Sequence, residues 1–95
     1  MTRRFEKSER IEAQMVLADN IRELVDSSGY GDIAVAKILR ITSSQLHRYK
    51  YGLDDVPAVI ANDICKFFNV DVRKIFVTDK EWLELKGVNK NEKNN

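Results

Sequence analysis

Two short helical segments with almost nothing between them limit the fold of this chain more than any other feature. The first begins near Gly31-Asp32 and runs to about Leu39. The second begins at Thr42, where Thr42-Ser43-Ser44-Gln45 matches a capping box, and it ends at Gly52. Only Arg40-Ile41 separates them, so the two helices must pack directly against each other. Apolar residues lie nearly all round the first segment, which predicts a largely buried helix: Ile33, Val35, Ala36, Ile38 and Leu39.

The rest of the chain is also predicted to be helical, because only four glycines and one proline interrupt 95 residues. A first helix is expected from after Ser8 to Ser27, with Gly29 as its C-terminal cap. A fourth helix follows Pro57 and is capped by Asn69, and a short fifth spans about 72–77. Residues 78–81 repeat the capping-box pattern and predict one or two further helical turns. The inner face of the fourth helix is expected to be Val59, Ile60, Ile64, Phe67 and Phe68.

Length and composition divide the chain into four parts. A chain of 95 residues allows one domain. We expect a flexible basic arm at 1–8, which contains Arg3 and Arg4, and a domain at 9–77. A C-terminal segment follows at 78–88, and residues 89–95 contain no apolar side chain, which predicts a disordered tail. The fold class predicted is therefore all-α: a compact five-helix domain with an N-terminal arm and a polar C-terminal tail.

Several classes of function are excluded by what the sequence lacks. One cysteine, Cys65, and one histidine leave no disulfide framework and no set of metal ligands. No catalytic triad or phosphate-binding loop is present, so we expect neither an enzyme nor a cofactor. No apolar run approaches the ~20 residues that span a membrane. The lone cysteine fits a reducing cytoplasm and is expected to pack in the core.

A polar stripe on the segment after Thr42 carries the signal for function. Ser44, His47, Arg48 and Tyr51 fall at spacings of three and four, opposite Leu46 and Tyr49. Between residues 37 and 51 lie four basic residues and no acidic one, although the whole chain has a net charge of only +1. In a helix-turn-helix motif the second helix lies in the major groove of DNA. A side that gathers cations and hydrogen-bonding groups is typical of a surface that faces DNA.

The segment from about Leu17 to Val77, roughly 60 of the 95 residues, resembles the Cro/repressor-type helix-turn-helix family, also called XRE. The resemblance depends on Tyr30–Thr42, which matches the first helix of the motif and its turn, and on Ser43–Gly52, which matches the recognition helix. Pro57, Ile64, Phe68, Asn69 and Val70 match later positions of the family pattern. The resemblance implies a lambda-repressor-like domain that binds double-stranded DNA, with no cofactor and no metal.

Family roles are carried over position by position. The resemblance implies that Arg48 is the main base contact and that other residues of the recognition helix touch bases or phosphates. The basic charge of the turn and of the arm adds Arg40, Arg3 and Arg4 as expected DNA contacts. The expected DNA-binding set is Thr42, Ser43, Ser44, Gln45, His47, Arg48, Tyr51, Lys50, Arg40, Arg3 and Arg4. The expected homodimer contact uses Val72, Ile75, Phe76, Trp82 and Leu85.

Three departures from the family pattern bear on this interpretation. Asp32 stands where the family has a phosphate-contacting glutamine, and an acid there would repel phosphate. Arg40 replaces the turn glycine at a position that often needs left-handed geometry, and Lys50-Tyr51 replaces Glu-Asn before Gly52.

The predicted function is that of a cytoplasmic, nucleoid-associated, repressor-like regulator of a phage, plasmid or other mobile element. It would bind a palindromic operator as a dimer. The alternative is a helix-turn-helix module that binds another protein, as an antirepressor or antitoxin does, and binds DNA weakly or not at all. Asp32 and the low net charge favour that alternative.

Overall fold

The structure, a computed structural model, describes residues 7–87. Over that range it contains five α-helices and one 3-10 helix, and no strand, which confirms the all-α prediction. Of the predicted arm at 1–8, residues 1–6, with Arg3 and Arg4, lie outside the described range, and residues 7 and 8 belong to the first helix. The predicted tail at 89–95 also lies outside that range. The elements in chain order are α1 (Lys7–Ser27), α2 (Asp32–Leu39), α3 (Ser43–Lys50), α4 (Ala58–Phe68), η1 (Val72–Phe76) and α5 (Asp79–Leu85).

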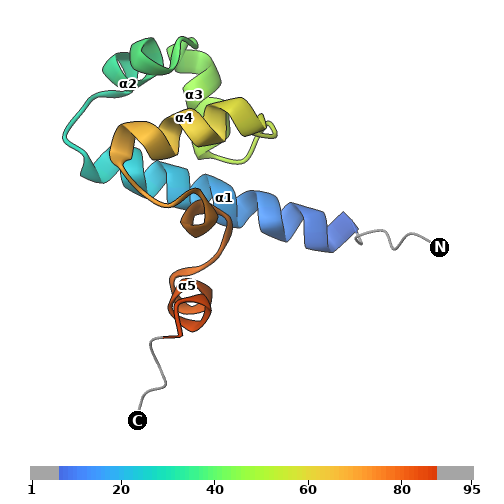
Figure 1. Ribbon diagram of the computed structural model, residues 1–95. Coiled ribbons are helices and arrows are strands. Elements are labelled where there is room, and N and C mark those ends of the chain that lie inside the picture. The colour runs from blue at the N-terminus through green and yellow to red at the C-terminus, as the bar shows by residue number, and fades with distance from the viewer. Residues whose placement is uncertain (1–6, 88–95) are drawn as a thin grey trace.

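Helix α1 is the longest element, and the other helices are arranged along it. It packs against α3 and η1, while α2 packs against α3 and α4 (Figure 1). Figure 1 shows α2 and α3 at one end of the molecule and α5 beyond η1 at the other. The α2–α3 pair and the C-terminal segment therefore lie at opposite ends of the molecule.

One core holds these elements together, and its residues follow the spacing of a helix face. Ala18, Ile21 and Val25 of α1 are buried at intervals of three and four. They meet Val35, Ala36 and Leu39 of α2, Leu46 of α3, Ala61 and Ile64 of α4, and Ile75 of η1. Burying each of the large aliphatic side chains contributes roughly 1.5–3 kcal/mol. Cys65 also lies in this core, as expected, and burial raises the pKa of its thiol.

The helix ends follow the local sequence signals. Arg40 and Asn69 cap α2 and α4 with φ values of 62° and 56°, so both adopt the left-handed conformation expected of them. Thr78 and Glu81 form a reciprocal capping box at the start of α5, as predicted. Arg40 and Asn69 thus end their helices without the glycine that more commonly occupies such positions.

Two predictions of burial are wrong. On α2, expected to be largely buried, Ile33 is 71% exposed and Ile38 is also exposed. On α4, Val59, expected on the inner face, is 70% exposed. Ile33 and Ile38 are exposed because α2 lies at the outer edge of the molecule, where only its Val35–Ala36–Leu39 face meets neighbouring helices. Within residues 7–87 no helix has the length and apolarity required to span a membrane.

Candidate nucleic-acid interface

The turn between α2 and α3 fixes how the two helices meet. The N–H of Arg40 donates to the carbonyl of Lys37 at 3.1 Å, and that of Ile41 donates to Ala36 at 3.0 Å. Thr42 then caps α3, because its hydroxyl accepts from the N–H of Gln45 at 3.0 Å. Half of the predicted capping box is thus present. The other half is not, because the side-chain amide of Gln45 donates to Asp54 instead.

Helix α3 has two faces, as its periodicity predicts. Leu46 and Tyr49 are buried against the core. Ser44, His47, Arg48 and Tyr51 are exposed on the other side, and we call these four residues the α3 ridge. At the end of the ridge the rings of His47 and Tyr51 lie 4.7 Å apart. All four residues of the ridge keep exposed surface, although other side chains of the monomer touch Arg48 and Tyr51.

Arg48, the expected main base contact, is held by a carboxylate that sequence analysis did not single out. Its Nε donates to Asp54 Oδ2 at 2.9 Å and its Nη2 donates to Asp54 Oδ1 at 3.0 Å. The Nε2 of Gln45 donates to the same Oδ2 at 3.0 Å. The hydrogen bonds from Arg48 and Gln45 lower the pKa of Asp54 to about 2, and the pKa of Arg48 is raised in turn. The pair therefore stays ionised at neutral pH.

The loop after α3 brings Asp54 back to Arg48. Gly52 has φ +70°, in the left-handed region, and the N–H of Leu53 donates to the carbonyl of Arg48 at 2.9 Å. From α1, Gln14 Nε2 donates to the carbonyl of Gly52 at 2.6 Å. A Cβ at Gly52 would lie 2.7 Å from Met15 Sδ, so α1 approaches this loop closely. The only sequence signal was the glycine itself, since Arg48 and Asp54 are not at helical spacing.

Lys50 requires a correction, because it does not add positive charge to the α3 ridge. Its side chain points into the protein and the residue is only 5% exposed. Nζ lies 2.9 Å from Asp26 Oδ1 and 2.9 Å from Asp32 Oδ1. Burial alone would lower the pKa of Lys50, but the hydrogen bonds that Lys50 donates to Asp26 and Asp32, with their negative charge, outweigh it, so the pKa is raised. Lys50 lies four residues after Leu46, on the buried face, and that spacing was the available signal.

This pairing gives Asp32 a structural role. The carboxylate lies in the first turn of α2, where the helix dipole favours negative charge, and it balances the buried ammonium of Lys50. Arg22 of α1 reinforces the same corner, because its Nη1 donates to the carbonyl of Lys50 at 2.8 Å. Its guanidinium carbon also lies 5.0 Å from the ring centre of Tyr51. The C-terminal end of α3 is therefore fixed to α1 and to the start of α2.

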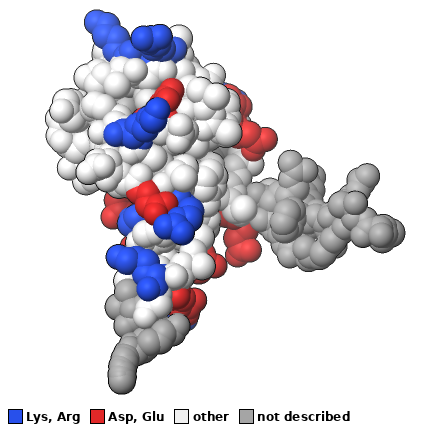
Figure 2. Space-filling view, in the orientation of Figure 1, with Lys and Arg blue, Asp and Glu red and all other residues white. Residues whose placement is uncertain are grey.

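The remaining residues of the expected set lie around the ridge. Thr42, Ser43 and Arg40 are exposed, and Gln45 is half-buried. Lys37 of α2 is exposed as well. Figure 2 shows positive side chains over α2 and the turn that follows it, above a largely uncharged surface. The structure thus groups Arg40, Thr42, Ser43 and the α3 ridge at one end of the molecule, and leaves Lys50 out.

The expected dimer contact is only partly on the surface. Ile75 is buried in the monomer core, so it cannot meet a partner, and that part of the prediction is wrong. Val72, Phe76 and Leu85 are exposed, and Trp82 is half-buried with Arg73 and Lys86 near its ring. None of the residues of α5 is buried. We call Val72, Phe76, Trp82 and Leu85, the four residues of the expected contact that keep exposed surface, the C-terminal face.

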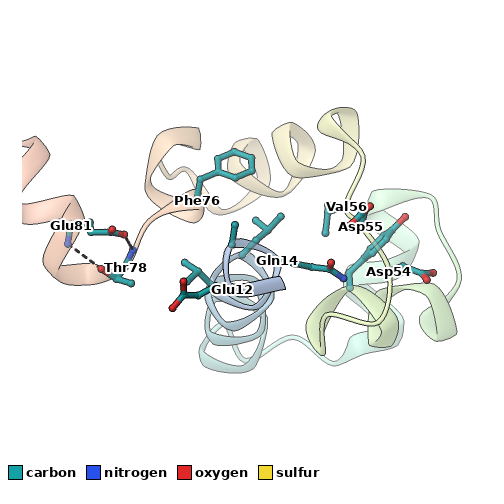
Figure 3. A pocket seen from close by; sticks show the side chains of 12 residues that line it. Glu12, Gln14, Asp54, Asp55, Val56, Phe76, Thr78 and Glu81 are labelled. Carbon is teal, nitrogen blue, oxygen red and sulfur yellow. Dashed lines mark hydrogen bonds between the residues drawn. The ribbon is translucent and has the colours of Figure 1, made fainter. Parts of the chain in front are cut away.

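An open groove of about 710 Å³ runs between α1, the loop at 54–56 and the start of α5. Figure 3 shows Glu12 and Gln14 between the loop carboxylates on one side and Phe76, Thr78 and Glu81 on the other. Its rim is acidic, because Glu12, Asp54, Asp55 and Glu81 are among its lining residues. Residues 7–87 contain no cluster of three or more His, Cys, Asp or Glu side chains suited to a metal ion.

Comparison with known proteins adds no further constraint: no family model, no curated protein and no solved structure matches this chain.

Proposed function

We propose that this protein is a helix-turn-helix regulator of the Cro/repressor type that binds a specific sequence of double-stranded DNA. The observation that carries the proposal is the α3 ridge, which is exposed beside a short turn and bears hydroxyl, imidazole and guanidinium groups. These groups match the donors and acceptors along base edges in the major groove. Helix α3 packs on α2, and Leu46 of α3 lies in the core that the two helices share. In a helix-turn-helix motif the first helix supports the second in this way and the second enters the major groove.

The contacts divide into two kinds. In the proposed complex Ser44, Gln45, His47 and Arg48 contact base edges. Arg40, in the turn before α3, and Tyr51, just after α3, contact phosphates. Thr42 and Ser43 begin α3, where helix N–H groups favour phosphate oxygens. Lys50 is not among the contacts. The proposed interface therefore depends more on side chains that contact bases than on exposed cations. Such an interface favours sequence-selective binding over strong non-specific binding.

Dimerisation through the C-terminal face completes the proposal. A single helix-turn-helix module contacts one half-site, whereas a two-fold dimer places two recognition helices about 34 Å apart, one turn of DNA. The C-terminal face is apolar and lies at the end of the molecule away from α2, so pairing there leaves the ridge open. A repressor-like role on a mobile element, in the cytoplasm, extends the family resemblance.

The test is a pair of arginine variants in a DNA-binding assay. Genomic fragments that bind the protein are sequenced to find the site, and affinity for that site is measured over a range of salt. Arg48→Ala should lower the affinity by about 1–3 kcal/mol and relax base preference at one position. Arg73→Ala is the matched control, because Arg73 of η1 makes a similar two-point pair with Asp71, the residue just before η1.

The control should bind like the wild type, provided that sedimentation shows the same oligomeric state for both. Equal and weak binding of the wild type to all sequences at low salt would contradict the proposal.

A second function, binding to another protein, is favoured by a different observation. Arg48 and Lys50 are both paired with carboxylates of the same monomer, and Ile33 and Ile38 of α2 and Val59 of α4 are exposed. Exposed apolar side chains, with cations of α3 already paired, suit a protein partner. If the wild type shows no sequence-selective binding, Ile33→Lys should abolish capture of that partner from the source cell, whereas Arg48→Ala should not.

A further inference from the structure

We propose that Asp54 is a positioning residue that presents the outer edge of the Arg48 guanidinium to a guanine, making the protein selective for a G·C pair at one position of each half-site. This inference rests on the proposed function. It adds which base is read at that position, guanine, and which residue determines the choice, Asp54.

The donors of Arg48 divide between two edges of one plane. Asp54 accepts from Nε and Nη2, which form the side edge of the guanidinium. A guanidinium has five N–H donors, so Nη1 and the second hydrogen of Nη2 remain, and they form the end edge. Guanine offers two acceptors, N7 and O6, at the spacing of such an edge, and this pairing is the commonest specific contact in the major groove. The side edge is occupied by protein, and the end edge is the one that fits guanine.

Asp54 itself is held firmly enough to fix that plane. Gly52 turns the chain in the left-handed conformation, and hydrogen bonds from Leu53 to Arg48 and from Gln14 to Gly52 fasten the loop at both sides. Gln45 adds a third donor to the carboxylate of Asp54, from one helical turn earlier on α3. A free arginine samples many rotamers and loses that freedom on binding, whereas Arg48 has already lost it.

The charge of the pair points in the same direction. Arg48 and Asp54 together are neutral, so the pair gains little from the phosphate backbone at large. The pair instead presents two hydrogen-bond donors in a fixed direction. It therefore gains binding free energy from the correct base and not from DNA in general.

The experiment selects bound sequences from a randomised DNA library for five proteins: the wild type, Asp54→Ala, Asp54→Asn, Arg48→Lys and Asp71→Ala. The wild type should enrich guanine at one position of each half-site, and Arg48→Lys should lose that enrichment because lysine lacks the two-donor edge. Asp54→Ala should lower the guanine preference about tenfold while binding to random DNA stays equal or increases. Asp54→Asn, which keeps one acceptor, should fall between. Asp71→Ala should match the wild type, since it removes a like pair outside α3.

The outcomes separate this inference from the proposed function. A wild type with no preferred sequence would remove the proposed function itself. A selective wild type whose guanine position survives Asp54→Ala, or whose variant binds every sequence more tightly with the same preference, would overturn the inference alone, because Asp54 would then only block Arg48. Thermal unfolding of each variant shows that it is folded, and a loss of preference with retained binding is not produced by a merely structural role.

Discussion

Arg48 and Asp54 set the acid–base behaviour of the α3 ridge. Hydrogen bonds from Arg48 and Gln45 hold the pKa of Asp54 at about 2, below the ordinary 3.8. A carboxylate with a lowered pKa in the folded state contributes stability above its ordinary pKa. That contribution is lost as the pH falls through the folded value. The contribution of this pair is therefore fully present above pH 4 and disappears towards pH 2.

An NMR titration of the Asp54 carboxyl carbon measures that pKa directly. We expect a midpoint near 2 in the wild type and a return towards 3.8 in Arg48→Ala. Asp71 provides an internal control, because its pKa is also about 2 through Arg73 and should not change. A wild-type midpoint at 3.8 for Asp54 would show that the pair does not form in solution.

Gly52 should be among the positions least tolerant of a side chain. Gly52→Ala places a β-carbon at φ +70° and 2.7 Å from Met15 Sδ, so it combines backbone strain with a clash. The expected loss of unfolding free energy is about 2 kcal/mol, against about 1 kcal/mol for Gly29→Ala. Gly29 has φ +85° and nothing within 4 Å, so it isolates the strain. Urea unfolding measures both losses. When Met15→Ala is added to Gly52→Ala, the part of the loss that is due to the clash should disappear.

The turn between α2 and α3 lowers the free energy of unfolding of the protein. Arg40 adopts φ 62°, a conformation that costs a non-glycine residue energy. Arg40→Gly should therefore raise stability by about 0.5–1 kcal/mol, while it reduces the salt slope of DNA binding by about one. Asn69→Gly is the matched control at φ 56°, at the end of α4. It should leave DNA binding unchanged. Unchanged DNA binding in Arg40→Gly would remove Arg40 from the interface.

Between elements, Lys50 links α3 to α1 and α2 through two carboxylates. Asp26→Ala or Asp32→Ala alone leaves the other carboxylate on the buried ammonium, so each should cost about 1 kcal/mol. The double variant leaves a buried charge without a partner, and we expect about 3 kcal/mol, more than the sum. Urea unfolding of the four proteins in the cycle measures the difference, and Asp55→Ala serves as the neutral control. Strict additivity would mean that the two carboxylates act independently of Lys50.

How much of the elements the sequence predicts depends on the range of the interaction. The opposite faces of α3, with Leu46 and Tyr49 inside and Arg48 outside, follow from periodicity alone. The left-handed caps also follow from local chemistry. Lys50 with Asp26 and Asp32, and Arg48 with Asp54, depend on how helices and loops pack, and charge counts treat every cation as free. The same limit applies to Ile33 and Val59, since an apolar side chain does not reveal whether its face has a neighbour.

For the whole molecule, the C-terminal face decides whether one protomer or two meet the DNA. Leu85→Lys places a charge on that face, where Leu85 is 65% exposed in the monomer. We expect the variant to sediment as a monomer at concentrations where the wild type is a dimer, with little change in unfolding of the monomer. Ile33→Lys is the matched control, an equally exposed apolar residue at the other end of the molecule. A dimer that survives Leu85→Lys but not Ile33→Lys would place the contact on α2.

The buried position of Lys50 changes what can be expected of this protein in concentrated electrolyte. Of the four cations between residues 37 and 51, Lys50 and Arg48 are neutralised by carboxylates of the same chain. That leaves Lys37 and Arg40, so this region of a protomer displaces only about two condensed counterions from the duplex. Occupancy of the operator should therefore decline slowly as ionic strength rises, and the choice among operators should persist where more basic repressors have already dissociated.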